Sequence, residues 1–279
     1  MRFLARKRIF EATPRRPLIM GVLNVTPDSF YDGGRYSALE AAISRAREML
    51  DEGADIIDVG GESTRPGSYG VSADEEIARV VPAIEYIVSR FSATVSVDTS
   101  KPEVAEAAVA AGAAIINDVT ACGLSGGRMA DVAASSGAGL ILMHMKGAPP
   151  SMQTGVIEYG DVVAEIKEYL AGRVRFAVSG GVAPENIAVD PGIGFGKTPA
   201  HNMDIIRRLG EFADVGRPVL VGASRKSFLG SIKGMENPDD RLFGTLAAHL
   251  AAVSNGASII RVHDVRAHSE FFRTLAAIG

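Results

Sequence analysis

Four copies of one short pattern constrain the fold of this chain more than any other feature. In each copy a glycine and a small residue precede an apolar run: EGADIIDV from Glu52, AGAAIIND from Ala111, SGAGLILM from Ser136 and NGASIIRV from Asn255. The glycine can adopt the left-handed conformation that ends a helix, and the apolar run is typical of an interior strand. Each copy therefore predicts one connection from a helix to a strand of a parallel sheet.

Further apolar runs complete a set of eight expected strands. They are residues 19–24, 56–59, 95–98, 115–117, 140–143, 187–190, 219–222 and 259–262. Helical patterns fill the intervals, with Ser72-x-x-Glu75 and Ser100-x-x-Glu103 interpreted as capping boxes. Strands and helices that alternate in this way close most simply into one parallel β/α (TIM) barrel over residues 18–279, with a doubly wound open sheet as the alternative. Residues 1–17 are expected to form a short hairpin that caps the barrel.

Composition narrows the class of protein. The chain has 279 residues, 47% of them hydrophobic, which suits one large domain. A formal net charge of −4 without long charged runs gives no reason to expect a nucleic-acid partner. The N-terminal segment MRFLARKRIF is interrupted by Arg and Lys, and no apolar run reaches membrane-spanning length. We therefore expect a cytoplasmic protein with no membrane partner, in which the single Cys122 is a packing residue.

The stretch from Gly180 to Lys197, GGVAPENIAVDPGIGFGK, places Asp190 directly after an apolar run. A buried carboxylate is costly unless it is matched, which favours a ligand with paired N–H donors. A salt-bridged loop aspartate is the alternative. The tail GIGFGKT resembles a phosphate-binding loop, but Pro191 stands where that loop needs a glycine.

Polar residues gather at the carboxyl ends of the expected strands, where β/α barrels build their sites. One set suits a polar heteroaromatic ring: Asp98, Asn117, Asp190 and Lys226. A second set suits phosphate oxygens: Asn24, Arg261 and His263. Two segments rich in glycine, TPDSFYDGGRYS and GGESTRPGSYG, have the composition of loops that can close. The sequence therefore predicts a heterocyclic ligand that carries a phosphate ester.

Eight motifs resemble the dihydropteroate synthase family. They are NVTPDSF from Asn24, IDVGGESTRPG from Ile57, VDTSKPEV from Val97, IND from Ile116, LMHMKG from Leu142, DPGIGFGK from Asp190, SRKS from Ser224 and RVHDV from Arg261. The resemblance runs from about Leu18 to the last expected helix, with the motifs in the family's order. It implies an enzyme that joins 6-hydroxymethyl-7,8-dihydropterin diphosphate to 4-aminobenzoate and releases diphosphate. Sulfonamides, which imitate 4-aminobenzoate, are then expected to compete with it.

The resemblance also implies a role for individual residues. The dihydropterin diphosphate would be held by Thr64, Asp98, Asn117, Met143, Asp190, Lys226, Arg261 and His263, with Met143 against the ring face. The 4-aminobenzoate pocket would include Phe30, Pro66, Phe195, Lys226 and Ser227. Asn24 would meet Mg²⁺ or the diphosphate, and the catalytic residues would be Asp32, Arg65, Lys226, Arg261 and His263.

The implied reaction is an alkyl transfer to nitrogen, in which diphosphate leaves before the arylamine attacks and no nucleophilic side chain is required. Two alternatives remain: a pterin-binding barrel that transfers a methyl group to a corrinoid, and a non-catalytic pterin-binding paralogue. The family further suggests a homodimer, with Arg241-Leu242-Phe243 as a candidate surface.

Overall fold

The computed structural model describes residues 1–13, 15–25, 34–62, 70–147, 157–232 and 235–278. In this part of the chain, eight parallel strands close into a barrel in the order β10-β3-β4-β5-β6-β7-β8-β9. The strands are β3 (Leu18–Asn24), β4 (Ile56–Gly60), β5 (Val95–Asp98), β6 (Ile115–Asp118), β7 (Gly139–Met143), β8 (Ile187–Asp190), β9 (Val219–Val221) and β10 (Ala257–Val262). The predicted barrel is confirmed, and the closed order excludes an open sheet.

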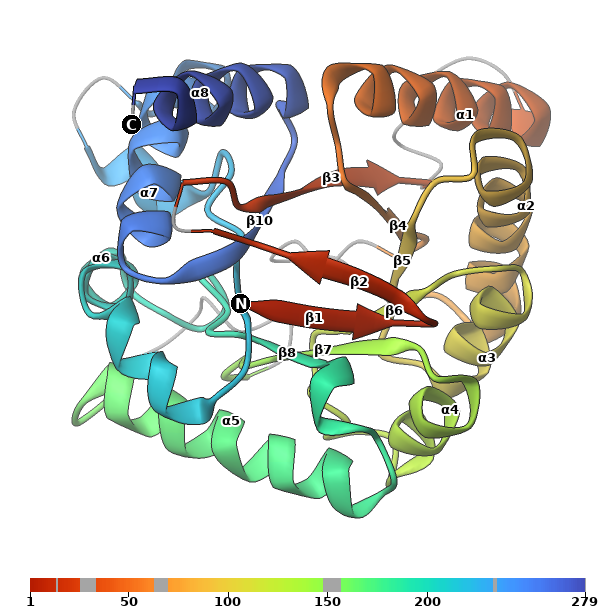
Figure 1. Cartoon of the computed structure of the whole chain (residues 1–279), viewed down its shortest axis with the longest axis horizontal. Coiled ribbons are helices and arrows are strands. Elements are labelled where there is room, and N and C mark those ends of the chain that lie inside the picture. The colour runs from red at the N-terminus through yellow and green to blue at the C-terminus, as the bar shows by residue number, and fades with distance from the viewer. Residues whose placement is uncertain (14, 26–33, 63–69, 148–156, 233–234, 279) are drawn as a thin grey trace.

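Helices surround the barrel on its outside (Figure 1). They are α1 (Gly34–Glu52), α2 (Ala73–Phe91), α3 (Pro102–Ala110), α4 (Arg128–Ser136), α5 (Val162–Ser179), α6 (Pro199–Arg207), α7 (Leu242–Ser254) and α8 (Val265–Ile278). Short 3₁₀ turns add η2 (Pro184–Asn186), η3 (Leu209–Val215), η4 (Ser227–Ser231) and η5 (Pro238–Arg241). The last helix, α8, packs against the first helix, α1, and this contact closes the ring of helices around the barrel.

The four glycines of the recurring pattern have the predicted conformation. Their φ angles are +103° at Gly53, +113° at Gly112, +66° at Gly137 and +107° at Gly256. Residues with a Cβ rarely adopt such angles, so glycine at these positions lets the next strand begin after only two to four residues beyond the end of each helix.

One predicted helix start is wrong. At α2, Ser72 accepts a hydrogen bond from the Glu75 backbone N–H, as expected of a cap. At α3 the N-cap is Lys101, and the Ser100 box does not form. Lys101 precedes Pro102, and a residue before proline is disfavoured in the helical region, so Lys101 stays extended at φ −103° and ψ 119°.

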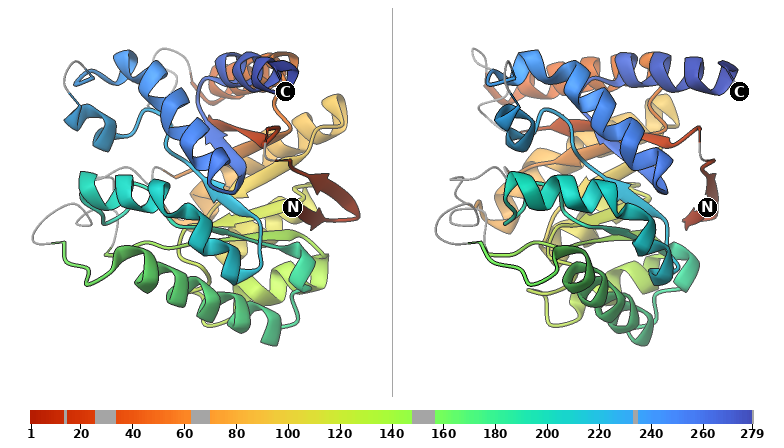
Figure 2. Two further views of the ribbon diagram at one scale, coloured as in Figure 1. Left: turned by 60° about the vertical axis from the view of Figure 1, so that its left-hand side comes forward. Right: turned by 90° about the vertical axis from the view of Figure 1, so that its left-hand side faces the viewer.

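The hairpin of β1 (Arg2–Ala5) and β2 (Arg8–Glu11) lies across one end of the barrel (Figures 1 and 2). Phe3 and Ala5 are buried in one cluster with interior residues of the barrel, among them Met20 and Ile141. The Phe3 ring lies so close to Gly139 that a Cβ there would come within 2.5 Å of it. The hairpin thus closes the end at which the strands begin and leaves the end at which they finish for a ligand.

Two further expectations concern single residues. Cys122 is buried, and burial raises the pKa of its thiol to about 12, as suits a packing residue. Arg241 does not lie on a surface: it is 8% exposed and donates to the backbone oxygens of Arg225 and Met235. Phe243, two residues later, is 79% exposed.

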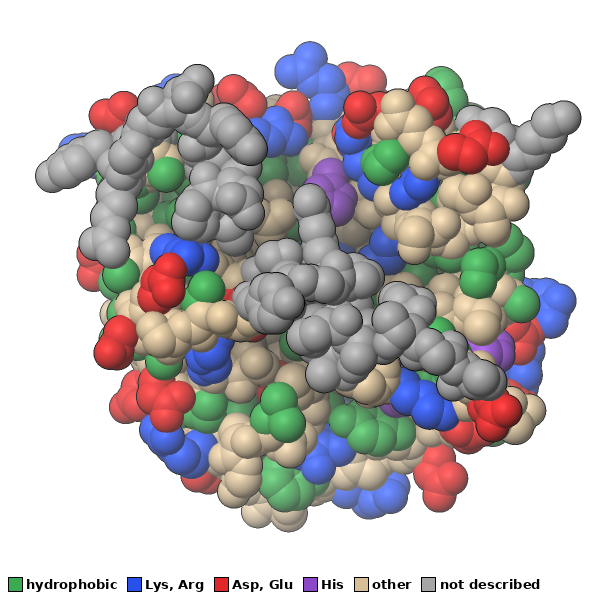
Figure 3. Space-filling view, turned by 180° about the vertical axis from the view of Figure 1, so that it is seen from behind, with side chains coloured by type: hydrophobic (Ala, Val, Ile, Leu, Met, Phe, Trp, Pro, Cys, Tyr) green, Lys and Arg blue, Asp and Glu red, His purple; other side chains and the backbone are tan. Residues whose placement is uncertain are grey.

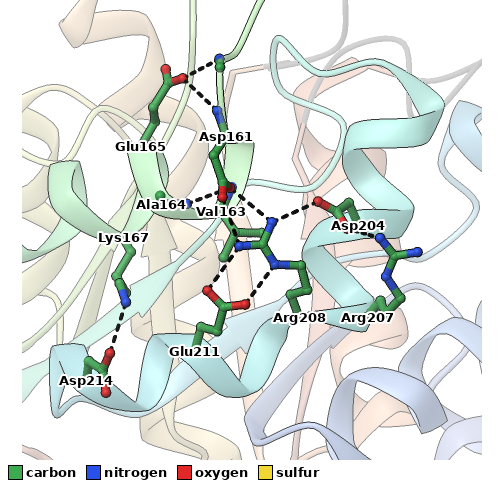
Figure 4. Close-up of polar contacts among 11 residues, drawn as sticks. Asp161, Val163, Ala164, Glu165, Lys167, Asp204, Arg207, Arg208, Glu211 and Asp214 are labelled. Atoms are coloured by element: carbon green, nitrogen blue, oxygen red, sulfur yellow. Dashed lines mark hydrogen bonds and ion pairs between the residues drawn. The ribbon is translucent and has the colours of Figure 1, made fainter.

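An ion-pair cluster on the outside of the barrel joins α5, α6 and η3 (Figure 4). Arg208 pairs with Asp161, Asp204 and Glu211, at N–O distances from 2.7 to 3.2 Å. Asp161 is also the N-cap of α5, where it accepts from the Val163 and Ala164 backbone N–H groups. The cluster therefore fixes the start of one helix to the end of another. No helix among the described residues is both long and apolar enough to cross a membrane.

Candidate active site

The register of the barrel brings the predicted polar residues to one rim. Asn24, at the end of β3, lies beside Gly60 of β4, and Gly60 lies beside Asp98 of β5. Asp98 is paired in turn with Asn117 of β6. On the other side of the barrel, Met143 of β7 is paired with Asp190 of β8. These strand ends lie opposite the hairpin, and Figure 3 shows Lys, Arg and His side chains gathered near the middle of that face.

Arg261 is the centre of a buried polar network. Its Nε donates to Asp58 Oδ2 at 2.6 Å, and its Nη2 donates to Asp98 Oδ2 at 2.7 Å. Asn117 Nδ2 also donates to Asp58 Oδ2, at 3.1 Å. The sequence separated residues for a ring from residues for phosphate, but the structure joins the two sets through Arg261. Asp58, to which the sequence assigned no role, connects them.

Two oxygens of this network have no partner. Among the described buried side chains, Asp58 Oδ1 and Asp98 Oδ1 accept no hydrogen bond. Burial raises the pKa of Asp98 to about 7, although the Arg261 cation opposes that change. A buried acceptor without a donor is unfavourable, so a ligand N–H at Asp98 would relieve it.

Asp190 and Lys226 form the opposite side of the site. Asp190 is buried and its Oδ1 accepts from the Gly192 backbone N–H at 2.7 Å. Burial raises the pKa of Asp190, and the Lys226 cation opposes the rise. Lys226 Nζ donates to the Ile193 carbonyl and lies 4.5 Å from the centre of the Phe195 ring. Burial lowers the pKa of Lys226 to about 8.

Two loops on the β9 and β10 side are tied together. Ser224 Oγ lies 3.0 Å from His263 Nδ1 and accepts from the His263 backbone N–H at 3.2 Å. Arg225 makes a bidentate pair with Asp264, at 2.9 and 2.6 Å. His263, on the loop directly after the strand that carries Arg261, is therefore held by the neighbouring loop.

A pair of buried histidines joins the same two loops from behind. The Ala223 backbone N–H donates to His249 Nε2 at 3.1 Å, and His249 Nδ1 lies 2.9 Å from His268 Nε2. His268 Nδ1 lies 2.7 Å from the Asp264 carbonyl oxygen. Because the chain begins at an N–H and ends at a carbonyl, both rings are neutral and donate through Nδ1. Burial lowers the pKa of both.

A cavity of about 360 Å³ opens beside Asp98, among the segments that follow β4, β5, β6 and β7. Glu62, Lys101, Thr120 and Tyr169 are among its lining residues. Its volume is within the range of small-molecule sites.

The structure brings ten of the predicted site residues to this rim or to the loops directly after it. They are Asn24, Asp98, Asn117, Met143, Asp190, Phe195, Lys226, Ser227, Arg261 and His263. The other five, Phe30, Asp32, Thr64, Arg65 and Pro66, lie outside the described residues. Asp58 is a site residue to which the sequence assigned no role. Its position in the middle of the apolar strand IIDVG could have indicated one, since a carboxylate there needs a partner.

Comparisons with known proteins agree on one family. Residues 20–263 match the pterin binding enzyme family. Dihydropteroate synthase of Escherichia coli is 46% identical over 94% of this chain and 91% of the relative. The Xanthomonas albilineans dihydropteroate synthase structure in complex with 7,8-dihydropteroate has a TM-score of 0.88 at 41% identity and covers 100% of this chain and 98% of its own. The Yersinia pestis dihydropteroate synthase structure with a sulfonamide drug has a TM-score of 0.91 at 41% identity, with coverage of 100% and 99%. The chain therefore belongs to the pterin binding enzymes and, within them, to the dihydropteroate synthases.

Proposed function

We propose that this protein condenses 6-hydroxymethyl-7,8-dihydropterin diphosphate with 4-aminobenzoate to give 7,8-dihydropteroate and diphosphate. The proposal rests mainly on the buried carboxylates at one rim of the barrel. Asp98 Oδ1 has no hydrogen-bond donor. Two cations, Lys226 and Arg261, act on the carboxylates of Asp98 and Asp190. A ring with several N–H groups and a charged ester matches this arrangement.

In this proposal the pterin ring donates N–H groups to Asp98 and Asp190. Asn117, whose amide is already oriented by Asp58, adds donor and acceptor capacity, and Met143 packs against the ring face. Thr64 would contact the same substrate, by its resemblance to the family motif.

Arg261 and His263 would bind the diphosphate. Mg²⁺ would be held beside them by the side-chain oxygen of Asn24, which lies next to Gly60 and Asp98 at the rim. The described residues contain no group of three or more His, Cys, Asp or Glu that could hold a metal ion. Mg²⁺ commonly keeps waters and leans on substrate phosphates, so Asn24 alone would be an adequate anchor, and the ion would neutralise negative charge on the diphosphate.

The reaction breaks the bond between the pterin methylene carbon and the diphosphate oxygen, and it forms a bond from that carbon to the arylamine nitrogen, which then loses a proton. Arg261 and His263 would stabilise the leaving diphosphate. Phe195, Lys226 and Ser227 would bind 4-aminobenzoate, with Ser227 at its carboxylate. By their place in the family motifs, Phe30 and Pro66 would complete that pocket, and Asp32 and Arg65 would act at the reacting groups.

One assay tests the proposal. The protein is mixed with the dihydropterin diphosphate and 4-aminobenzoate, with and without Mg²⁺, and diphosphate release is followed. We expect release that needs both substrates, rises with Mg²⁺ and is inhibited by a sulfonamide in competition with 4-aminobenzoate. Pterin binding without diphosphate release would instead favour a methyltransferase or a non-catalytic paralogue.

We also propose that the protein is a cytoplasmic homodimer, with the exposed Phe243 of α7 in the interface. A large exposed aromatic side chain on a helix is a common interface anchor. Light scattering after size-exclusion chromatography tests this: a dimer that Phe243→Glu converts to a monomer would support the proposal, and a monomeric parent protein would contradict it.

A further inference from the structure

Lys197 is a buried cation directly behind the proposed ring site, and its side chain is 2% exposed. Its Nζ donates to the Phe195 carbonyl at 2.9 Å and to the His144 carbonyl at 3.3 Å, and it lies 3.0 Å from His144 Nδ1. An ammonium group has three N–H donors, so these contacts use all of them. None of the three acceptors is a carboxylate.

His144 is a suitable hydrogen-bond acceptor for the Lys197 ammonium group. It is buried, and burial together with the Lys197 cation lowers its pKa to about 3, so the ring is neutral. Nδ1 accepts from Lys197, which places the ring proton on Nε2. The ring also packs edge-on against Tyr169, with centroids 5.0 Å apart.

The loops that follow β7 and β8 lie in direct backbone contact at this point. A Cβ at Gly192 would be 1.9 Å from the His144 carbonyl oxygen, and a Cβ at Gly196 would be 2.1 Å from the Lys146 carbonyl oxygen. The His144 backbone N–H also donates to the Asp190 carbonyl at 2.9 Å. Lys197 therefore crosses between two loops that already touch.

These two loops carry two residues of the proposed ring site, Met143 and Asp190, and one residue of the proposed 4-aminobenzoate pocket, Phe195. The Phe195 carbonyl is a direct acceptor of Lys197. Burial lowers the pKa of Lys197 to about 7, and the nearby charge of Asp190 opposes this change and favours the ammonium form. In return, the Lys197 charge favours the carboxylate form of Asp190. The other cations that act on Asp190 are Lys226 and Arg261.

We propose that Lys197 is a positioning residue for pterin binding: its ammonium group, held by His144 and the Phe195 carbonyl, fixes the loops after β7 and β8 and supplies positive charge behind Asp190. The inference rests on the proposed function, because it concerns the same ring site. Lys197 itself does not touch the substrate.

The test is Lys197→Met, which keeps much of the side-chain length and removes the charge and the donors. Lys146→Met is the matched control, since Lys146 is an exposed cation on the neighbouring loop whose Nζ donates to the Glu158 carbonyl. Calorimetry measures binding of 6-hydroxymethyl-7,8-dihydropterin, without diphosphate, from pH 6 to pH 9, which is roughly the range in which buried carboxylates and lysines titrate.

We expect Lys197→Met to weaken pterin binding about tenfold, the size of one charge-assisted hydrogen bond, and Lys146→Met to leave it unchanged. Asp190 must be ionised to accept the ring N–H groups, and loss of a nearby cation raises its pKa. When the pH is lowered, Asp190 of Lys197→Met should therefore become protonated, and pterin affinity should be lost, at a pH about one unit higher than in the parent protein. A residue that only supported the fold would not move this profile.

Parent affinity and an unmoved pH profile in Lys197→Met would overturn the inference and leave the proposed function intact. Absence of pterin binding to the parent protein would overturn both. If Lys197→Met does not fold, His144 decides: His144→Asn keeps an acceptor near the Nδ1 position, whereas His144→Leu removes it. Loss of pterin affinity in His144→Leu alone would support the inference, and equal affinity in the two variants would overturn it.

Discussion

Two arginines of this protein bind several carboxylates each, in opposite surroundings. Arg208, on the outer surface, pairs with Asp161, Asp204 and Glu211 (Figure 4). Arg261, at the rim of the barrel, pairs with Asp58 and Asp98, which are both buried. The two arginine side chains are similarly exposed, at 30% and 21%, so the difference lies in the carboxylates: these are 23% to 46% exposed around Arg208 and 0% and 8% exposed around Arg261.

The difference appears in the carboxylates. Hydrogen bonds from Arg208 lower the pKa of Asp161 to about 2, whereas Asp98 has its pKa raised to about 7 because burial outweighs the attraction of Arg261. A surface pair is weak because water screens it and solvates both partners. A buried pair has lost that hydration, so it gains when a ligand offers further donors. Burial, not pairing, therefore makes the Arg261 network suited to binding.

The largest expected effect is that of Arg261→Met. It leaves two buried carboxylates without their cation, which destabilises proteins by about 3 kcal/mol or more. Urea unfolding of the free protein measures this. We also expect binding of the dihydropterin diphosphate to weaken more than binding of the free pterin alcohol. Equal losses for the two ligands would mean that Arg261 supports the structure and does not bind phosphate.

Asp190→Asn should have the next largest effect, on binding. The amide places an NH₂ donor where the ring needs an acceptor, which weakens pterin binding by about 1 to 3 kcal/mol. Asp161→Asn is the surface control and should leave the affinity unchanged. Calorimetric titration with the dihydropterin decides, and an Asp190→Asn protein with the parent's affinity would remove this residue from the site.

Asp98→Asn should separate stability from binding. The folded-state pKa of Asp98, about 7, lies above its ordinary value of 3.8, so this group makes the folded protein less stable as the pH rises from about 4 to about 7. At pH values above that point we expect the variant to be more stable, on the order of 1 kcal/mol, while it loses pterin affinity. Asp161→Asn should instead lower the stability at these pH values, because the lowered pKa of Asp161 contributes stability that is lost only as the pH falls from about 4 toward 2. Urea midpoints measured across pH test both signs; a less stable Asp98→Asn protein above pH 7 would contradict the comparison.

The smallest effect should be that of Arg208→Met. Its three partners all keep contact with water after the change, since Asp161 and Glu211 are exposed and Asp204 is half-buried, so the urea midpoint should move little and substrate affinity not at all. Added salt should reduce even that small difference, because exposed charges are screened. A loss of stability comparable to that of Arg261→Met would show that burial is not what distinguishes the two networks.

Local sequence signals predicted most of the fold. The helix ends at Gly53, Gly112, Gly137 and Gly256 follow from backbone sterics that act within a few residues, and strands that alternate with helices leave few ways to close a sheet. The failure at Ser100 has the same local character, since Pro102 restricts Lys101 more strongly than the capping pattern favours it. Motif order and strand ends likewise predicted which residues would share a rim.

What the sequence determined by itself was therefore the barrel, the end that holds the site and the residue types gathered there, because periodicity, glycine conformation and the position of strand ends are properties of short segments. The closed barrel was needed to reveal that Arg261 joins Asp58 to Asp98, that Lys197 bridges the loops after β7 and β8, and that two neutral histidines connect the loops after β9 and β10. These contacts join residues far apart in the chain, and their strength depends on how completely the closed barrel excludes water.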